Sequence, residues 1–192
     1  MHKRFDAPLG AIPIALVLAL GLLVAVPAIG RAAEAAPAET PAALTDANIA
    51  AIVLAANTID VDNGKLAIAR SKTPAVKAFA QQMITDHTSV NTKAVALAGK
   101  LGLVPVENQA GKHLVASTDA TRKAMRKLSG KAFDRAYVNN EVAYHQAVID
   151  LLDKTIVPAV QNQQLKDLLV SVRPAFVAHL EHAKMIQADL SK

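Results

Sequence analysis

The chain has 192 residues and a formal net charge of +5, with 52% hydrophobic and only 3% aromatic residues. A chain of this length supports one hydrophobic core, and the scarcity of aromatic residues favours aliphatic helix faces over a β-sandwich. Cysteine is absent, which excludes disulfides, thiolate metal sites and cysteine nucleophiles.

The N-terminal residues have the pattern of an export signal. Lys3 and Arg4 precede an apolar run at 11–28, and small residues follow this run. We therefore predict a signal peptide at 1–30 and an exported protein that is periplasmic or associated with the outer membrane. The run also reaches the roughly 17 residues that a spanning helix needs, so an uncleaved anchor is the alternative. Residues 31–44 are rich in Ala and Pro without an apolar period, which predicts a flexible linker.

An apolar residue at every third or fourth position predicts that residues 45–190 form an all-α domain. Thr45 or Asp46 can cap the first helix, and Thr73 followed by Pro74 suits the start of the second. The predicted helices, in chain order, span 45–70, 75–100, 119–128, 131–155 and 165–190. We therefore predict a four-helix bundle with a short extra helix in the long connection between the second and third long helices.

The predicted short helix is strongly basic. Residues 103–117 before it contain Pro105 and Gly111 and are predicted as a loop, and Gly130 ends the helix. Its basic residues, with one that follows it, are Arg122, Lys123, Arg126, Lys127 and Lys131. Export and the few aromatic residues argue against binding to nucleic acid. We expect instead a weak contact with an anionic membrane surface.

Each long helix has polar residues within its apolar stripe. They are Asp60 in the first helix, His87 in the second, Glu141 and His145 in the third and His179 in the fourth. The turns near Lys72 and Pro158 bring antiparallel neighbours back to the same level. We therefore predict that these residues share one layer of the core. His182 lies one turn beyond His179 on a nearby face.

This layer predicts a metal site. An unpaired buried polar group costs about 1–3 kcal/mol, so these side chains need partners. Imidazole nitrogen and carboxylate oxygen are ligands that suit Zn, Fe, Mn or Cu. The candidate metal ligands are Asp60, His87, Glu141, His145, His179 and His182. In the alternative, the histidines form a purely structural network, and Glu141 and His145 are only a pair one turn apart on a helix surface.

Three segments carry a resemblance to a known family: NGKLAIARSKTPAVKAFAQQMITDH, LSGKAFDRAYVNNEVAYH and RPAFVAHLEHA. They resemble a bacterial exported, ferritin-like family of unknown function, whose members are often labelled predicted outer-membrane proteins. The resemblance covers about 44–184 and implies a ferritin-like bundle with His87, His145 and His179 at the family's characteristic histidine positions. It implies no reaction. The family usually has Glu where Asp60 and Asp62 stand in this chain.

The chain does not match the di-metal pattern of ferritin-like enzymes, which requires Glu-x-x-His on two helices. Asp86 adjoins His87, and Glu141 precedes His145 by four residues instead of three. A di-iron oxidase is therefore not favoured. Three functional hypotheses remain: an exported metal-binding or metal-sensing bundle, a structural or stress-protective envelope protein without metal, and, least favoured, an enzyme on a ferritin-like scaffold.

Overall fold

A computed structural model describes residues 44–192. The predicted signal peptide at 1–30, and all but the last residue of the predicted linker at 31–44, lie outside the described residues. Within 44–192 every regular element is a helix, so the predicted all-α class is confirmed. No helix in this stretch combines the length and the apolar character that a membrane span needs.

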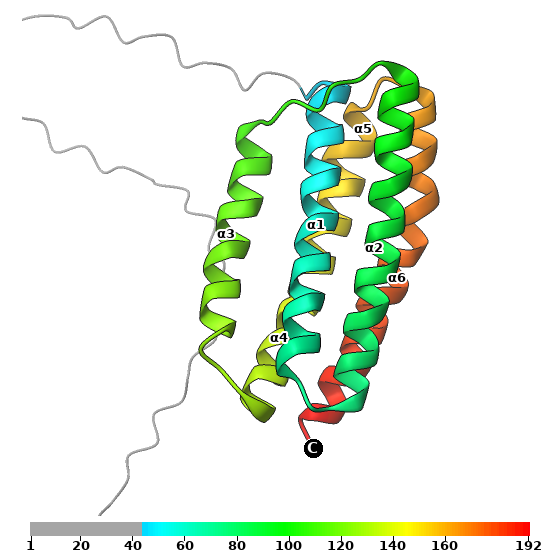
Figure 1. The fold of residues 1–192 in the computed structure, drawn as a ribbon. Coiled ribbons are helices and arrows are strands. Elements are labelled where there is room, and N and C mark those ends of the chain that lie inside the picture. The colour runs from blue at the N-terminus through cyan, green and yellow to red at the C-terminus, as the bar shows by residue number, and fades with distance from the viewer. Residues whose placement is uncertain (1–43) are drawn as a thin grey trace, which may run out of the picture. The chain divides into compact units, whose positions relative to one another are not determined.

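The long helices pack side by side into a bundle (Figure 1). They are α1 (Asp46–Arg70), α2 (Pro74–Leu101), α4 (Gly130–Leu151) and α6 (Gln163–Leu190). The most extensive contacts join α1 to α2 and α4 to α6. Another helix, α3 (Gln109–Met125), lies along α1 and follows the connection that leaves α2 (Figure 1).

Three apolar clusters occupy the core: one on either side of a polar layer, and a smaller one around Val90, Phe176 and Leu180 beside it. The first contains Phe79, Met83, Phe133 and Tyr137, and the second contains Ile49, Ile52, Leu165 and Leu169, among others. On every long helix the polar residues predicted to share a layer lie between members of these two clusters. The apolar stripes therefore set both the core and the level of the polar layer.

The predicted caps of the first two helices are placed correctly, although two side chains have other partners. Thr45 caps α1 and exchanges hydrogen bonds with Asn48, each at 3.2 Å. Asp46 instead accepts hydrogen bonds from the backbone N–H groups of Gln161 and Asn162 at 2.9 Å, which ties the start of α6 to α1. Thr73 lies at the N-cap of α2, where its hydroxyl donates to the Asp134 carboxylate and makes no capping bond.

Gly64 lies at a close approach of α1 to α2. A Cβ atom at this position would lie 2.8 Å from the Ala80 carbonyl oxygen and 2.9 Å from Ile84 Cγ1. Only glycine fits this crossing without displacing α2. Asp60 is one turn away on α1, so the close approach at Gly64 helps to bring that carboxyl group to His87 on α2.

The predicted loop at 103–117 is wrong for much of its length. Helix α3 begins at Gln109 rather than Asp119, and it ends at Met125 rather than Leu128. Asn108 caps the helix, because its side-chain oxygen accepts the Gly111 N–H at 2.8 Å. Gly111 signalled a loop, but it lies in the first turn, where backbone N–H groups lack intrahelical partners.

The predicted helix at 131–155 also differs in its last turn. Helix α4 ends at Leu151 and continues as a π-helix, η1 (Leu152–Ile156), followed by α5 (Val157–Ala159). Pro158 has no N–H group with which to continue an α-helix. The N–H of Val157 bonds to the Leu152 carbonyl, five residues earlier, as a π-turn requires. Helix α6 then runs without a break through Pro174.

Candidate metal centre

Three histidines from three helices meet in the polar layer. His87 of α2, His145 of α4 and His179 of α6 are at most 2% exposed. Their ring centroids are separated by 5.2–5.6 Å, and one ring nitrogen of each lies within 4.8 Å of the others. We call these residues the histidine triad.

The hydrogen bond of His87 fixes which ring nitrogen carries its proton. His87 Nδ1 lies 2.8 Å from Asn57 Oδ1 and 3.5 Å from Asp60 Oδ2. The amide of Asn57 is oriented by its own Nδ2, which donates to the Val53 carbonyl at 2.8 Å. Asn57 Oδ1 can therefore only accept, so the proton of neutral His87 is on Nδ1 and the lone pair is on Nε2.

The other two histidines are held in the same way. His145 Nδ1 donates to the backbone carbonyl of Glu141 at 3.0 Å. His179 Nε2 donates to Asp86 Oδ2 at 2.9 Å. Both partners only accept hydrogen bonds, so the lone pairs lie on His145 Nε2 and His179 Nδ1. Such outer acceptors orient metal-bound imidazoles in many proteins.

The three nitrogens that hold lone pairs are buried and lack partners. His87 Nε2, His145 Nε2 and His179 Nδ1 make no hydrogen bond to any of the residues described. An orphaned buried polar atom costs about 1–3 kcal/mol. A cation bound between the rings would satisfy all three atoms at once.

The environment keeps the triad neutral. Burial, followed by the charges of the neighbouring imidazoles, lowers the pKa of His87 to about 2. Burial and the charge of His179 lower the pKa of His145 to about 4. Burial also lowers the pKa of His179, although the hydrogen bond to Asp86 acts in the opposite direction. Neutral imidazole is the form that binds metal, so the triad is ready to coordinate near pH 7.

Two carboxyl groups lie against the triad. Asp60 of α1 and Glu141 of α4 are 3% and 0% exposed, and with His145 they form a second group whose ligand atoms lie within 4.8 Å. Burial, and then the charge of Glu141, raises the pKa of Asp60 well above its ordinary value. Burial raises the pKa of Glu141 from 4.5 to about 7. We call these residues the carboxyl pair, which retains protons at acidic pH.

Aromatic rings and α3 enclose the layer. Phe176 stacks on His87, with ring centroids 5.2 Å apart and planes inclined by 18°. The Tyr144 hydroxyl donates to the Ala56 carbonyl at 3.1 Å. From α3, Arg122 Nε donates to Asn63 Oδ1 at 3.1 Å. The layer is therefore closed by the Phe176 ring at the triad and by the Arg122 guanidinium on the α3 side.

The structure brings together all the predicted ligands except one. Asp60, His87, Glu141, His145 and His179 belong to the two groups described above. His182 belongs to neither group among residues 44–192. Its Nδ1 lies 3.1 Å from Gln82 Oε1, and its ring meets the edge of Phe79 at 5.2 Å, in the seam between α2 and α6.

Sequence reasoning missed the acceptors that orient the rings. Asp86 was noted only as the neighbour of His87, yet its carboxylate holds His179 on another helix. Asn57, which accepts from His87, was not among the candidate residues. Its position one turn before Asp60 was the available signal, whereas the Asp86 contact depends on how α2 faces α6.

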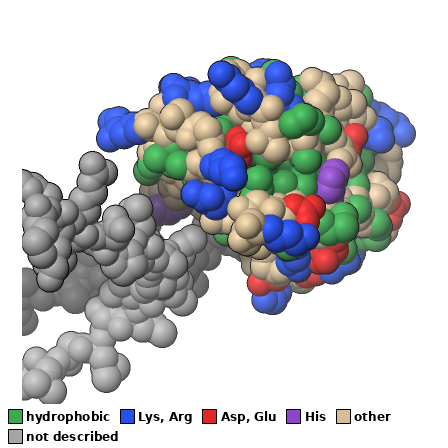
Figure 2. Space-filling model, turned by 90° about the horizontal axis from the view of Figure 1, so that it is seen from below, with side chains coloured by type: hydrophobic (Ala, Val, Ile, Leu, Met, Phe, Trp, Pro, Cys, Tyr) green, Lys and Arg blue, Asp and Glu red, His purple; other side chains and the backbone are tan. Residues whose placement is uncertain are grey.

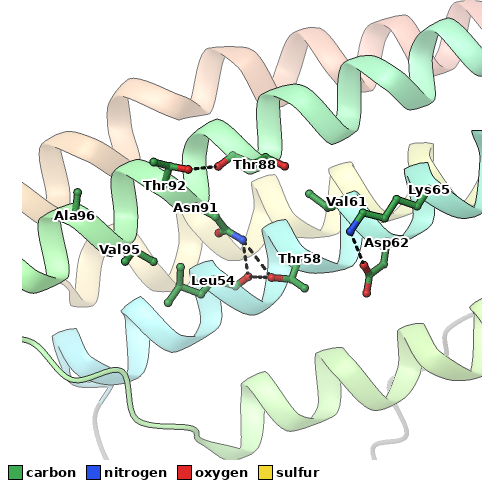
Figure 3. A pocket seen from close by; sticks show the side chains of 10 residues that line it. All are labelled: Leu54, Thr58, Val61, Asp62, Lys65, Thr88, Asn91, Thr92, Val95 and Ala96. Carbon is green, nitrogen blue, oxygen red and sulfur yellow. Dashed lines mark hydrogen bonds and ion pairs between the residues drawn. The ribbon is translucent and has the colours of Figure 1, made fainter.

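The surface groove in Figure 3 is not part of this centre. It measures about 760 Å³ and lies between α1 and α2. Asn91 Nδ2 donates there to the Leu54 carbonyl at 3.3 Å and to Thr58 Oγ1 at 3.1 Å. Neither the triad nor the carboxyl pair lines the groove.

Comparison with known proteins places the chain in a family without an assigned function. The chain matches the family described as Domain of unknown function (DUF4142) over residues 31–186. No curated protein matches the chain. A solved structure described as "CopM in the Cu(II)-bound form" is similar, with a TM-score of 0.59 and 14% sequence identity. The similarity covers 76% of this chain and 98% of that chain, and it concerns the fold alone.

Proposed function

We propose that this chain, which belongs to the DUF4142 family, binds one transition-metal ion through His87, His145 and His179. The observation that carries the proposal is the set of three buried imidazole lone pairs, each without a hydrogen-bond partner among the described residues. Three acceptors hold the opposite ring nitrogens: the side chains of Asn57 and Asp86 and the backbone carbonyl of Glu141. This is the outer-sphere arrangement that a metal-binding histidine requires.

The donor set fits the metal. The ligand atoms are His87 Nε2, His145 Nε2 and His179 Nδ1. Three neutral nitrogen donors suit Cu(II) or Zn(II), and Cu(II) binds most tightly of the divalent first-row ions. The structural similarity to CopM, which is described in a Cu(II)-bound form, supports testing copper first. The adjacent carboxyl pair would offset the positive charge of the ion.

The second group, formed by Asp60, Glu141 and His145, is the weaker candidate for a metal site. Both carboxyl groups have raised pKa values, so direct ligation would require each to lose its proton and its place in the pair. A cation bound to the triad would instead lower these pKa values through space and so make the pair negative. His145 Nδ1, the nitrogen that lies 3.6 Å from Glu141 Oε2, already donates to a backbone carbonyl. We therefore assign the carboxyl pair to charge compensation and not to direct ligation.

The rest of the assignment rests on the N-terminal pattern at 1–30 and on the family resemblance. The chain is an exported protein of the periplasm or outer membrane, its bundle is of the ferritin-like type, and its role is metal binding without turnover. The competing function is a structural or stress-protective envelope protein in which the histidines bind no metal. The exposed basic residues Lys123, Arg126, Lys127 and Lys131 would add a weak contact with anionic lipid.

The test is metal binding by the purified, tag-free protein and by His145→Leu. Leucine removes the lone pair of His145. Among the described residues, the only hydrogen bond lost is the one to the Glu141 backbone carbonyl within α4. We expect the unmodified protein to bind one equivalent of Cu²⁺ and to gain about 2.7 kcal/mol of stability at a free concentration one hundred times Kd. His145→Leu should lose this gain, as measured by urea unfolding with and without Cu²⁺.

Two further histidine variants serve as controls. His113 is exposed on α3 and His182 lies in the α2–α6 seam, so His113→Leu and His182→Leu should retain the metal-dependent gain. If Cu²⁺, Zn²⁺, Fe²⁺ and Mn²⁺ all leave the stability of the unmodified protein unchanged, the structural alternative replaces metal binding.

A further inference from the structure

We propose that the metal ion enters and leaves across the seam between α2 and α6, past the carboxylate of Asp86. This inference rests on the proposed function and adds a route to it. Asp86 is then the residue that first meets a hydrated cation, and His179 is the triad ligand closest to the entrance.

Exposure distinguishes Asp86 from the other carboxyl groups that contact the triad. The described residues pair three carboxyl groups with triad histidines: Asp60 with His87, Glu141 with His145 and Asp86 with His179. The side chains of Asp60 and Glu141 are 3% and 0% exposed, whereas that of Asp86 is 42% exposed. Only the Asp86 pair among them connects the buried rings to solvent.

The side of the bundle beneath α3 is closed to a cation. Arg122 is only 14% exposed and places its guanidinium between α3 and α1, where it binds Asn63 and Asp119. Its fixed positive charge repels an approaching metal ion. The first two apolar clusters close the layer toward both ends of the bundle. A third apolar cluster, which includes Val90 of α2 and Phe176 and Leu180 of α6, lies beside the triad. The partly exposed carboxylate of Asp86 is therefore a polar opening at the edge of this apolar packing.

The seam continues as a ladder of polar contacts. His179 Nε2 donates to Asp86 Oδ2 at 2.9 Å, and one turn further along, His182 Nδ1 lies 3.1 Å from Gln82 Oε1. Both contacts join the same two helices, and His182 and Gln82 are partly exposed. A carboxylate flanked by an imidazole and an amide can replace part of the hydration shell of an ion before the ion reaches His179.

The experiment measures the rate of Cu²⁺ uptake by the full chain carrying Asp86→Asn. Asparagine keeps an oxygen that can accept from His179, but it removes the charge. The control is Asp150→Asn on α4, because the Asp150 side chain is 46% exposed and the charge change is identical. Trp is absent, and the ring of Tyr144 lies 6.3 Å from that of His145, so bound Cu²⁺ should quench tyrosine fluorescence in a stopped-flow measurement.

We expect Asp86→Asn to slow association on the order of tenfold at low ionic strength, with a smaller difference at higher salt, because the attraction is electrostatic. Asp150→Asn should associate as fast as the unmodified protein. Equal slowing in both variants would indicate a general effect of charge and overturn the route. An unchanged association rate with faster dissociation would make Asp86 only a positioning residue. Absence of one-equivalent binding in the unmodified protein would instead overturn the proposed function.

Discussion

At the scale of single residues, burial shifts the pKa values of the polar layer in two directions, and both shifts favour the uncharged form. Burial lowers the pKa of His87 and His145, so these rings stay neutral by releasing protons. Burial raises the pKa of Glu141 to about 7, so this group stays neutral by retaining its proton. The layer therefore has its lowest electrostatic cost in mildly acidic solution, where both kinds of group are neutral.

This asymmetry predicts the pH dependence of Glu141→Gln. A group whose folded-state pKa is raised stabilises the fold below its unfolded pKa, here 4.5, and loses that contribution as pH rises through about 7. Glutamine has the same size and does not titrate. We expect the metal-free variant to gain stability relative to the unmodified protein between pH 4.5 and 7, with a slope of at most about 1.4 kcal/mol per pH unit.

Urea unfolding in the presence of chelator measures this difference at several pH values. The buried histidines titrate in both proteins, so their effect on stability cancels in the comparison. The pKa of Asp60 loses the contribution of the Glu141 charge in the variant, so the measured difference belongs to the carboxyl pair as a unit. Asp62→Asn, at a partly exposed carboxylate on the same helix as Asp60, should show no such slope. A difference between Glu141→Gln and the unmodified protein that stays constant over this range would mean that Glu141 is ionised in the folded state.

At the scale of helices, the apolar period predicts which residues share the core, because every third or fourth position faces the same side. That rule placed Asp60 and His87 at one level, through the turn near Lys72. It did not place the start of α3, because a capped helix whose first turn contains Gly111 has the same local composition as a loop. It also did not predict the π-turn of η1, which depends on how α4 reaches Pro158.

Which ring nitrogen of each triad histidine carries the proton depends on contacts between helices. The spacing of residues along one helix cannot predict it. The sequence places Asp86 beside His87, yet the carboxylate points across to His179. A helix turns by about 100° per residue, so adjacent residues face different neighbours. The candidate ligands were therefore accessible from the sequence, while their orienting acceptors were not.

Replacement by alanine should have opposite effects on stability at two glycines, Gly64 and Gly99. A Cβ at Gly64 would lie 2.8 Å from the Ala80 carbonyl, whereas a Cβ at Gly99 would meet nothing within 4 Å. Overpacking typically costs about 1–3 kcal/mol. Alanine stabilises an unobstructed helix position by about 0.5–1 kcal/mol relative to glycine. We therefore expect Gly64→Ala to lower the free energy of unfolding and Gly99→Ala to raise it.

Chemical denaturation of the metal-free protein gives both values. Because the close approach at Gly64 helps to bring Asp60 to His87, Gly64→Ala should weaken Cu²⁺ binding, while Gly99→Ala should leave binding unchanged. Stabilisation by Gly64→Ala would show that α1 and α2 can separate without cost, and the close crossing would then have no structural role.

At the scale of the whole described domain, basic side chains gather at the end where α3 leads into α4. Figure 2 views this end and shows Lys and Arg side chains around its rim. Of the five basic residues predicted to form a membrane contact, Lys123, Arg126, Lys127 and Lys131 are exposed. Arg122 is turned inward and binds Asp119 and Asn63, so it belongs to the closure of the polar layer and not to the basic surface.

The four exposed residues predict salt-sensitive adsorption to anionic vesicles. Each Lys or Arg near such a surface contributes about 1 kcal/mol, so replacing all four with Glu should weaken binding by at least tenfold at low salt. The difference should fade as salt rises, because the Debye length falls to about 8 Å at physiological ionic strength. Co-sedimentation with vesicles of phosphatidylserine and phosphatidylcholine measures it. The matched control places Glu at Lys93, Lys100, Lys112 and Lys154, which are exposed elsewhere and give the same change in net charge. Equal weakening in both sets would assign adsorption to net charge alone and remove the specific role of this end.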